Sequence, residues 1–224
     1  MLVTERLPKE TAREYALRIL KENIINLELA PGSMVSENEL SAELGISRTP
    51  VREALIDLSK AQIVEIFPQK GSRVSLIDYS LVEEARFLRL VLETAIVELA
   101  CSIADELNFT PIMEIIKLQK FYVENASPTK LLEYDNKFHE ELFRLCNKSQ
   151  TYLLIDSMTT HFDRVRSMSL ITIKDIKIVE DHIAIIKAIQ EKDVEAAKAV
   201  MTKHLSRYKI DKDVLRQKYP QYFK

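Results

Sequence analysis

Glycine is scarce in this 224-residue sequence, and all of it lies in the first third. The three glycines are Gly32, Gly45 and Gly71. Sheets and tight hairpins usually need glycine, whereas helices can turn on Asn, Ser, Lys or Asp. The absence of glycine after about Asp78 therefore argues against a sheet there and predicts that this larger part is all-helical.

Long apolar runs are also lacking, and cysteines are few. No stretch approaches the ~18 apolar residues that a membrane span requires, and Met1 is not followed by a basic-then-apolar signal. The two cysteines, Cys101 and Cys146, lie within helical patterns and indicate no disulfide framework. We therefore expect a protein of the reducing cytoplasm, with no membrane partner.

The sequence has no excess of positive charge, the usual electrostatic mark of a nucleic-acid-binding protein. The formal net charge is −2, and residues 1–76 hold 10 Lys+Arg against 11 Asp+Glu, a charge of −1. A DNA-binding surface in this part must therefore gather its basic residues on one face.

Turn residues divide the chain into two predicted domains, with a junction near Ser75–Tyr79. Residues 1–76 contain three helical stretches, the first at Lys9–Leu27, followed by a hairpin. This is the plan of a winged helix-turn-helix DNA-binding domain. Residues 77–224 carry six or seven amphipathic segments, which predict an all-α domain for ligand binding, metal binding and dimerisation. The predicted fold class is therefore mainly α.

Capping residues define the second and third helices. Ser36 and Glu39 have the spacing of a capping box, and Gly45 suits a left-handed cap at the end of this short helix. The third helix begins at Ser47, with Pro50 in its first turn, where no helical N–H is needed. The hairpin strands follow at Ile63–Phe67 and Ser72–Leu76.

The start of the third helix has the side chains that a major-groove reader needs. Arg48 and Arg52 lie one turn apart on the outward face, where each can bind a guanine edge or a phosphate. The alternative is that both are ordinary solvated charges. We favour DNA binding, because hydroxyls and free N–H groups at the helix start can bind phosphate, and basic side chains lie at or beside the wing tip. The residues concerned are Ser47, Arg48, Thr49, Arg52, Lys70 and Arg73.

This N-terminal pattern resembles the GntR family of regulators over about 65 residues. The motifs are Leu29-Ala30-Pro31-Gly32, Ser36-Glu37-Asn38-Glu39-Leu40, Ser47-Arg48-Thr49-Pro50-Val51-Arg52-Glu53-Ala54-Leu55 and Lys70-Gly71-Ser72-Arg73-Val74. The resemblance implies contacts with double-stranded operator DNA from the third helix and the wing, including Gly71. On the second helix it points to Ser36 and to Asn38, which stands where some members use an arginine.

Histidines interrupt the apolar faces of the helical part. Asp135 and His139 share one face of the Leu131–Cys146 stretch, and His182 lies on the inner face of Ile176–Gln190. Burying an ionisable group in such a face is costly unless the group is paired or bound. The last long helix is predicted to turn Ala197, Val200, Met201, His204 and Tyr208 inward.

The spacing of the histidines predicts a metal site. His182 lies ten residues before Lys192, where the last two helices are expected to turn, and His204 lies twelve after it. At ~1.5 Å rise per residue, an antiparallel hairpin places both imidazoles at one level. With Asp135 and His139 they can bind a divalent transition metal, zinc first and otherwise nickel, manganese or iron.

The helical part resembles the metal-binding branch of the FadR C-terminal domain group within the GntR family. Asp135, His139, His182 and His204 match that branch's four ligands in order and approximate spacing, and Arg89-Leu90-Val91-Leu92-Glu93 is similar to its Arg-x-x-Leu-Glu. Arginines suit an effector carboxylate but suit surface salt bridges equally well. The candidate effector-binding residues are Arg89, Arg164, Arg166 and His161, the last as pocket wall or core.

The sequence thus predicts a homodimeric transcription regulator on an inverted-repeat operator, controlled by a small carboxylate near the metal. Two alternatives stay open. An all-helical metallohydrolase would use the same Asp and histidines. It would not need the DNA-reading motif, however, and the sequence offers no evident general base for it. A regulator that senses acyl-CoA without a metal would leave the four metal-type residues unexplained.

Overall fold

The computed structural model describes residues 1–172 and 177–224. The N-terminal part contains α1 (Ala12–Ile25), β1 (Met34–Val35), α2 (Glu37–Leu44), α3 (Arg48–Lys60), β2 (Val64–Phe67) and β3 (Gly71–Val74). Eight α-helices follow: α4 (Tyr79–Ser102), α5 (Thr110–Glu124), α6 (Pro128–Leu145), α7 (Ser149–Met158), α8 (Thr160–Thr172), α9 (Lys177–Gln190), α10 (Val194–Leu205) and α11 (Tyr208–Lys218). Short 3₁₀ turns lie at Ala104–Glu106 and Pro220–Tyr222.

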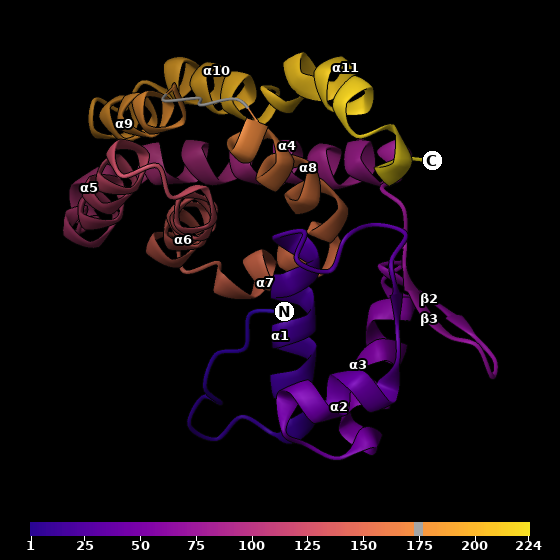
Figure 1. Ribbon diagram of the computed structural model, residues 1–224. Helices are drawn as coiled ribbons and strands as arrows, with labels where there is room; N and C mark the ends of the chain where they lie inside the picture. Colours follow the sequence, from indigo (N-terminus) through magenta and orange to yellow (C-terminus); the bar gives the residue numbers. More distant parts are fainter. Residues whose placement is uncertain (173–176) are drawn as a thin grey trace.

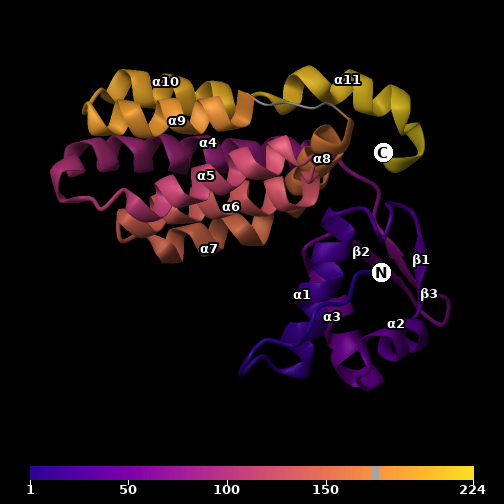
Figure 2. The same cartoon turned by 60° about the vertical axis from the view of Figure 1, so that its left-hand side comes forward.

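The mainly α fold class and the winged helix-turn-helix are confirmed. The wing is a three-stranded antiparallel sheet in the order β1-β3-β2, in which Arg73 of β3 lies between Met34 and Glu65. The sequence analysis missed β1 because two residues carry no alternating pattern. Figures 1 and 2 show the N-terminal domain below the helical domain, with α1, α2 and α3 packed beside the sheet.

The helix caps are confirmed in part. The Ser36 hydroxyl accepts from the Glu39 N–H, and Gly45 ends α2 with a φ of 65°, a conformation that costs glycine little. Ser47 has the extended backbone of an N-cap, but its hydroxyl makes no capping bond among the described residues. Pro50, the third residue of α3, removes one of the two N–H groups that usually bond to a cap side chain.

The number of helices predicted after residue 76 was too low. Six or seven segments were expected, whereas eight α-helices lie within 77–172 and 177–224. One source of the difference is a helix break at Thr159, between α7 and α8. Met158 therefore ends α7 in an exposed position, while Val165 is buried on α8. Ile176, where one predicted helix begins, and the side chain of Tyr208 lie outside the described residues.

Each of the two parts is stabilised by its own hydrophobic core. One fills the N-terminal domain between Tyr15 and Val74, and another fills the helical domain between Ile96 and Leu205. A smaller cluster lies under the C-terminal segment, where Ile77, Phe162, Leu215 and Phe223 pack together. None of the described helices combines the length and the apolar character needed to cross a lipid bilayer.

Candidate functional sites

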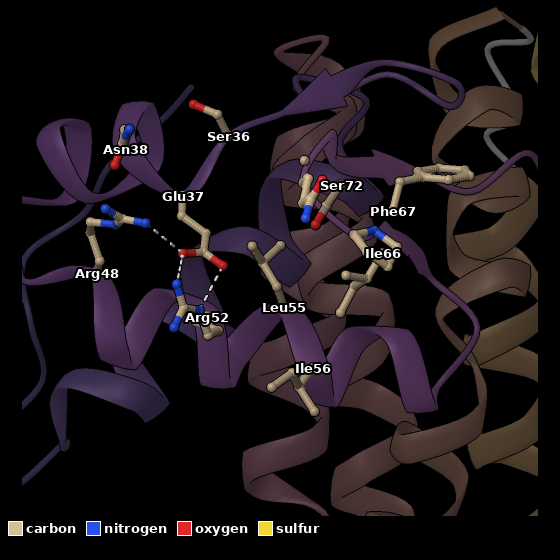
Figure 3. Close-up of a pocket in the computed structure, with 13 residues that line it drawn as sticks. Ser36, Glu37, Asn38, Arg48, Arg52, Leu55, Ile56, Ile66, Phe67 and Ser72 are labelled. Carbon is tan, nitrogen blue, oxygen red and sulfur yellow. Dashed lines mark hydrogen bonds and ion pairs between the residues drawn. The ribbon is translucent and has the colours of Figure 1, made fainter.

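The exposed groove between α2, α3 and the wing is the candidate DNA-reading surface. It has a volume of about 490 Å³, and Figure 3 shows Arg48 and Arg52 at its α3 side. Both side chains are more than half exposed. Ile56, Ile66 and Phe67 contribute apolar surface beside them. The groove also includes four residues from the predicted DNA-contacting set or its motifs: Ser36, Asn38, Gly71 and Ser72.

The remaining predicted DNA contacts take different positions. Ser47 and Thr49 are exposed at the start of α3, and Lys70 is exposed in the turn of the wing. Arg73 lies within β3, away from the turn, and its Nη2 is 2.6 Å from Oε2 of Glu65 on the neighbouring strand. The Arg73 guanidinium also lies over the Phe67 ring, with Cζ 5.2 Å from the ring centroid, so these two β2 side chains hold it against the sheet.

Glu37 is a groove residue that the sequence analysis did not assign. It is the first residue of α2, and its carboxylate accepts hydrogen bonds from Arg52 and from Arg48. An acidic side chain in the first turn of a helix is ordinary, because it complements the helix dipole. Its contacts with α3 depend on how α2 and α3 cross, which local sequence does not reveal.

A buried cluster of one carboxylate and three imidazoles lies in the helical domain. It comprises Asp135 and His139 of α6, His182 of α9 and His204 of α10, whose donor atoms all lie within 4.8 Å of one another. Nε2 of His204 is 3.1 Å from Nε2 of His139 and 3.4 Å from Nε2 of His182. The α9–α10 hairpin thus brings its two histidines to one level, as predicted.

The other nitrogen of each imidazole faces a polar side chain. Nδ1 of His139 lies 2.6 Å from Glu93 Oε2, and Nδ1 of His182 lies 2.8 Å from Gln119 Oε1. In His204, Nδ1 lies 3.7 Å from a carboxylate oxygen of Asp181. Such contacts fix the ring orientation and keep Nε2 toward the cluster, an arrangement typical of metal-binding histidines.

These donors fit a divalent transition metal. Ligands at ~2.1 Å from one ion stand roughly 3.0–3.4 Å apart in tetrahedral or octahedral geometry, close to the Nε2 separations. Asp135 Oδ1 lies 3.3 Å from His182 Nε2 and is buried with no hydrogen bond from the described residues. Burial lowers the pKa of His139 to about 4 and that of His182 well below its usual value, so both rings are neutral near pH 7, as ligands must be.

Arginines balance the buried carboxylates. Burial alone would raise the pKa of Asp135, but Arg166, which bonds its Oδ2, and the three neighbouring histidines together outweigh burial and hold that pKa well below its usual range. Burial opposes ionisation of Glu93 too, but Arg89, with Nε 2.6 Å from Oε1, and His139 together outweigh it and lower the Glu93 pKa to about 2. Both carboxylates therefore stay charged at neutral pH.

Arg89 and Arg166 also line a small polar cavity beside the cluster. Its volume is about 10 Å³, room for about one water molecule. Asn136 and Tyr152 line it as well. The two arginines have charged and hydrogen-bonding groups suited to a carboxylate.

His161 and Arg164, the other two predicted effector residues, lie at the junction of the domains. Nε2 of His161 is 3.2 Å from the main-chain oxygen of Gln62, and Arg164 Nη1 donates to the main-chain oxygen of Ser75 at 2.6 Å. Arg164 Nη2 is 2.6 Å from His161 Nδ1. Burial lowers the Arg164 pKa to about 9. These two side chains contact the N-terminal domain, and neither lines the small cavity.

Sequence reasoning missed the residues that orient the histidines. Glu93 belongs to the Arg-x-x-Leu-Glu motif and could have been found as an acidic residue at an inward helical position. Gln119 and Asp181 gave no such signal, because their role depends on how α5, α6 and α9 pack around the cluster.

Comparisons with known proteins cover both parts of the chain. Residues 13–74 match the family described as bacterial regulatory proteins, gntR family, and residues 84–207 match the FCD domain. The HTH-type transcriptional repressor RspR of Escherichia coli K12 is 29% identical over 221 residues, 98% of this chain and 97% of that protein. An uncharacterized HTH-type transcriptional regulator of Streptomyces ambofaciens is 33% identical over 206 residues, which are 91% of this chain and 86% of that protein.

Solved structures show the same fold. The structure of E. coli McbR/YncC superposes with a TM-score of 0.78 at 19% identity, over 93% of this chain and 99% of that one. These families and relatives are transcriptional regulators and not enzymes, and the DNA-reading groove and buried cluster lie in the two matched segments. The chain belongs to the GntR family of bacterial transcription regulators and carries a C-terminal FCD domain.

Proposed function

We propose that this regulator acts as a cytoplasmic homodimer on an inverted-repeat operator, and that a small carboxylate bound beside a divalent metal controls its affinity for DNA. The observation that carries the proposal is the convergence of three Nε2 atoms and Asp135 in one buried cluster. The metal would be held by Asp135, His139, His182 and His204, with zinc the first candidate. Bound there, it would supply Lewis-acid attraction for a ligand oxygen.

Arg89 and Arg166 are the proposed carboxylate-binding residues. Both line the cavity next to the cluster, and each is already paired with a buried carboxylate, Glu93 or Asp135. An effector must therefore enlarge the cavity, because about 10 Å³ admits only a water-sized group. The cavity would enlarge where Arg166 leaves Asp135, since a cation bound at Asp135 competes with Arg166 for the same carboxylate.

Helix α8 gives a physical route from this site to the DNA-binding domain. Arg166 of α8 bonds Asp135, while His161 and Arg164 of the same helix bond main-chain oxygens of Gln62 and Ser75. A shift of α8 when Arg166 changes partner would move Gln62 and Ser75, which flank the wing hairpin, and would therefore move the DNA-binding domain. The effector would act by binding one arrangement of the heads better than the other.

An exposed apolar surface on α4 and α7 supports the homodimer. Phe87 and Val91 lie one turn apart on α4, and Leu153, Leu154 and Met158 lie on α7, all about half exposed or more. Phe87 and Met158 line one shared hollow. A continuous apolar surface is typical of an interface, and a two-fold contact would present two DNA heads to an inverted repeat.

Metal analysis of purified protein tests the cluster. We expect about one divalent ion per chain by mass spectrometry, with a rise in melting temperature when zinc is added after chelation. His182→Ala and Asp135→Ala should abolish both effects. His161→Ala removes a buried histidine outside the cluster and should keep the metal. A metal content unaffected by His182→Ala would contradict the assigned ligands.

Operator binding tests the effector. The probes are a duplex selected in vitro from a randomised pool and a panel of mono-, di- and hydroxycarboxylates. We expect at least one carboxylate to change operator affinity in the zinc-loaded protein and to lose this effect in Arg89→Met. An unchanged affinity across the panel, with DNA binding intact, would overturn control by a carboxylate without touching the DNA-binding function.

A further inference from the structure

Glu37 is the one carboxylate among the described residues that line the DNA-reading groove, and it holds both arginines of α3. Its Oε1 accepts from Arg52 Nε at 2.8 Å, and its Oε2 accepts from Arg52 Nη2 at 2.8 Å. Arg48 Nη2 lies 3.4 Å from the same Oε2. Figure 3 shows the carboxylate between the two guanidinium groups.

The contact with Arg52 uses one defined edge of the guanidinium. A planar guanidinium has a side edge made by Nε and Nη2 and an end edge made by Nη1 and Nη2. Glu37 occupies the side edge in the two-bond geometry that Arg and carboxylate groups favour. The end edge keeps two N–H donors in parallel, which is the set that pairs with O6 and N7 of guanine.

The same contact changes the charge of the groove. Arg48 and Arg52 supply two positive charges, and Glu37 places one negative charge between them. The hydrogen bonds from Arg52 lower the pKa of Glu37, so the carboxylate is ionised at neutral pH. A phosphate that approaches either arginine therefore meets a neighbouring carboxylate as well, whereas a guanine edge carries no net charge.

We infer that Glu37 is a specificity-determining residue that fixes Arg52 for base reading and weakens its attraction to phosphates. In this role it lowers affinity for DNA of arbitrary sequence more than affinity for the operator. The effect matters because phosphate contacts supply nearly all non-specific binding, and a regulator must find its site among many competing ones. Glu37 acts through Arg52 and Arg48, so it is a positioning residue for the DNA contact.

The test compares wild type with Glu37→Gln on two duplexes by fluorescence anisotropy. One is the duplex selected in vitro by the wild-type protein, and the other is a scrambled duplex of equal length and composition. For Glu37→Gln we expect tighter binding to scrambled DNA and about a tenfold smaller ratio of selected to scrambled affinity. This is within the range that one lost base contact produces.

The salt dependence of DNA affinity distinguishes a positioning role of Glu37 from a purely structural one. An arginine released from Glu37 adds about one phosphate contact, so the slope of log affinity against log salt on scrambled DNA should steepen by roughly 0.9. Glu53→Gln is the matched control, because Glu53 is exposed on α3, carries the same charge and does not line the groove. It should change neither the ratio nor the slope to this extent.

A second variant makes the inference depend on Arg52 itself. In an Arg52→Ala background, Glu37→Gln should change the ratio much less, because only the longer contact with Arg48 at 3.4 Å remains. The inference is overturned if Glu37→Gln weakens both duplexes equally, if the ratio is unchanged, or if Glu53→Gln has the same effect. Melting curves of each variant show whether a loss reflects unfolding, and retained binding by the wild type keeps this result separate from the family's DNA-binding function.

Discussion

Buried charges dominate the helical domain at the scale of single residues. Asp135 and Glu93 are almost fully buried, and each is balanced by an arginine on a neighbouring helix turn or element. Removing one partner of such a pair lowers the free energy of unfolding by far more than the pair contributes to it, because the other partner is left as an unpaired buried charge. Each arginine near the cluster is therefore a structural counter-ion as well as a candidate ligand contact.

Arg166→Met should show this double role. In chelator-treated protein, Asp135 loses its main counter-charge, and we expect a loss of about 3 kcal/mol in the free energy of unfolding. Zinc should recover much of this loss if it takes over the carboxylate. Urea unfolding with and without zinc measures both values. Arg144→Met is the control, since the Arg144–Glu141 pair is exposed on the arginine side and should contribute under ~1 kcal/mol.

His161 should make stability fall in acid. Burial, and then the nearby Arg164 charge, lower its pKa to about 3; Asp78 and Lys224 are the other charged groups that act on it. The unfolded chain binds this proton below about pH 6.5, so the contribution is complete above that pH and is lost as pH falls toward 3. At pH 5 the loss is ~2 kcal/mol.

The comparison of His161→Gln with wild type by urea unfolding at pH 7 and pH 5 isolates this effect. The variant should lose about 2 kcal/mol less between the two pH values, even if it is less stable at pH 7. Equal pH dependence in the two proteins would show that the histidine is protonated without cost in the folded state.

At the scale of elements, the C-terminal segment secures the link between the domains. Ile77 N donates to the main-chain oxygen of Tyr222 at 2.8 Å, and Phe223 stacks on Tyr79 at a ring separation of 5.2 Å. Figures 1 and 2 show this end of the chain beside the start of α4. Residues 208–224 lie beyond the matched FCD segment, and they brace the junction through these contacts.

Phe223→Ala tests the brace. Removing a buried aromatic ring that packs on Tyr79 should cost about 3 kcal/mol, at the lower end for such truncations because the site is at the edge of a core. Thermal unfolding measures the loss, and protease cutting near Asp78 should accelerate. The exposed neighbour Gln221→Ala should change neither quantity; equal sensitivity of both variants would argue against a specific contact.

At the scale of the whole molecule, the proposed function requires two DNA heads. Leu154→Glu puts a charge on the exposed α4–α7 surface and should split the proposed dimer, as measured by sedimentation. Operator affinity should fall in parallel, because one head then binds a half-site alone. Ile183→Glu alters an equally apolar exposed residue on α9 and should leave the dimer intact. Unchanged sedimentation of Leu154→Glu would place the contact elsewhere.

The local sequence determined every element of the DNA-binding domain except β1, and it determined the residues of the cluster. Caps, a proline in the first turn of α3 and the turn before β3 act over a few residues, so they can be read from the chain directly. The cluster was predictable because Asp135 and His139 share one helix face, and because a hairpin of known rise aligns His182 with His204. The break at Thr159, the strand β1 and the eighth helix left no comparable pattern.

Tertiary structure alone decided which side chains surround the functional groups. Glu37 meets Arg52 because α2 crosses α3, and Gln119 meets His182 because α5 lies beside α9. Arg164 and His161 reach the main chain of the other domain instead of the cluster. A residue's spacing fixes the face it occupies on its own helix, whereas its partner depends on the angle and distance at which another element packs, which no local pattern encodes.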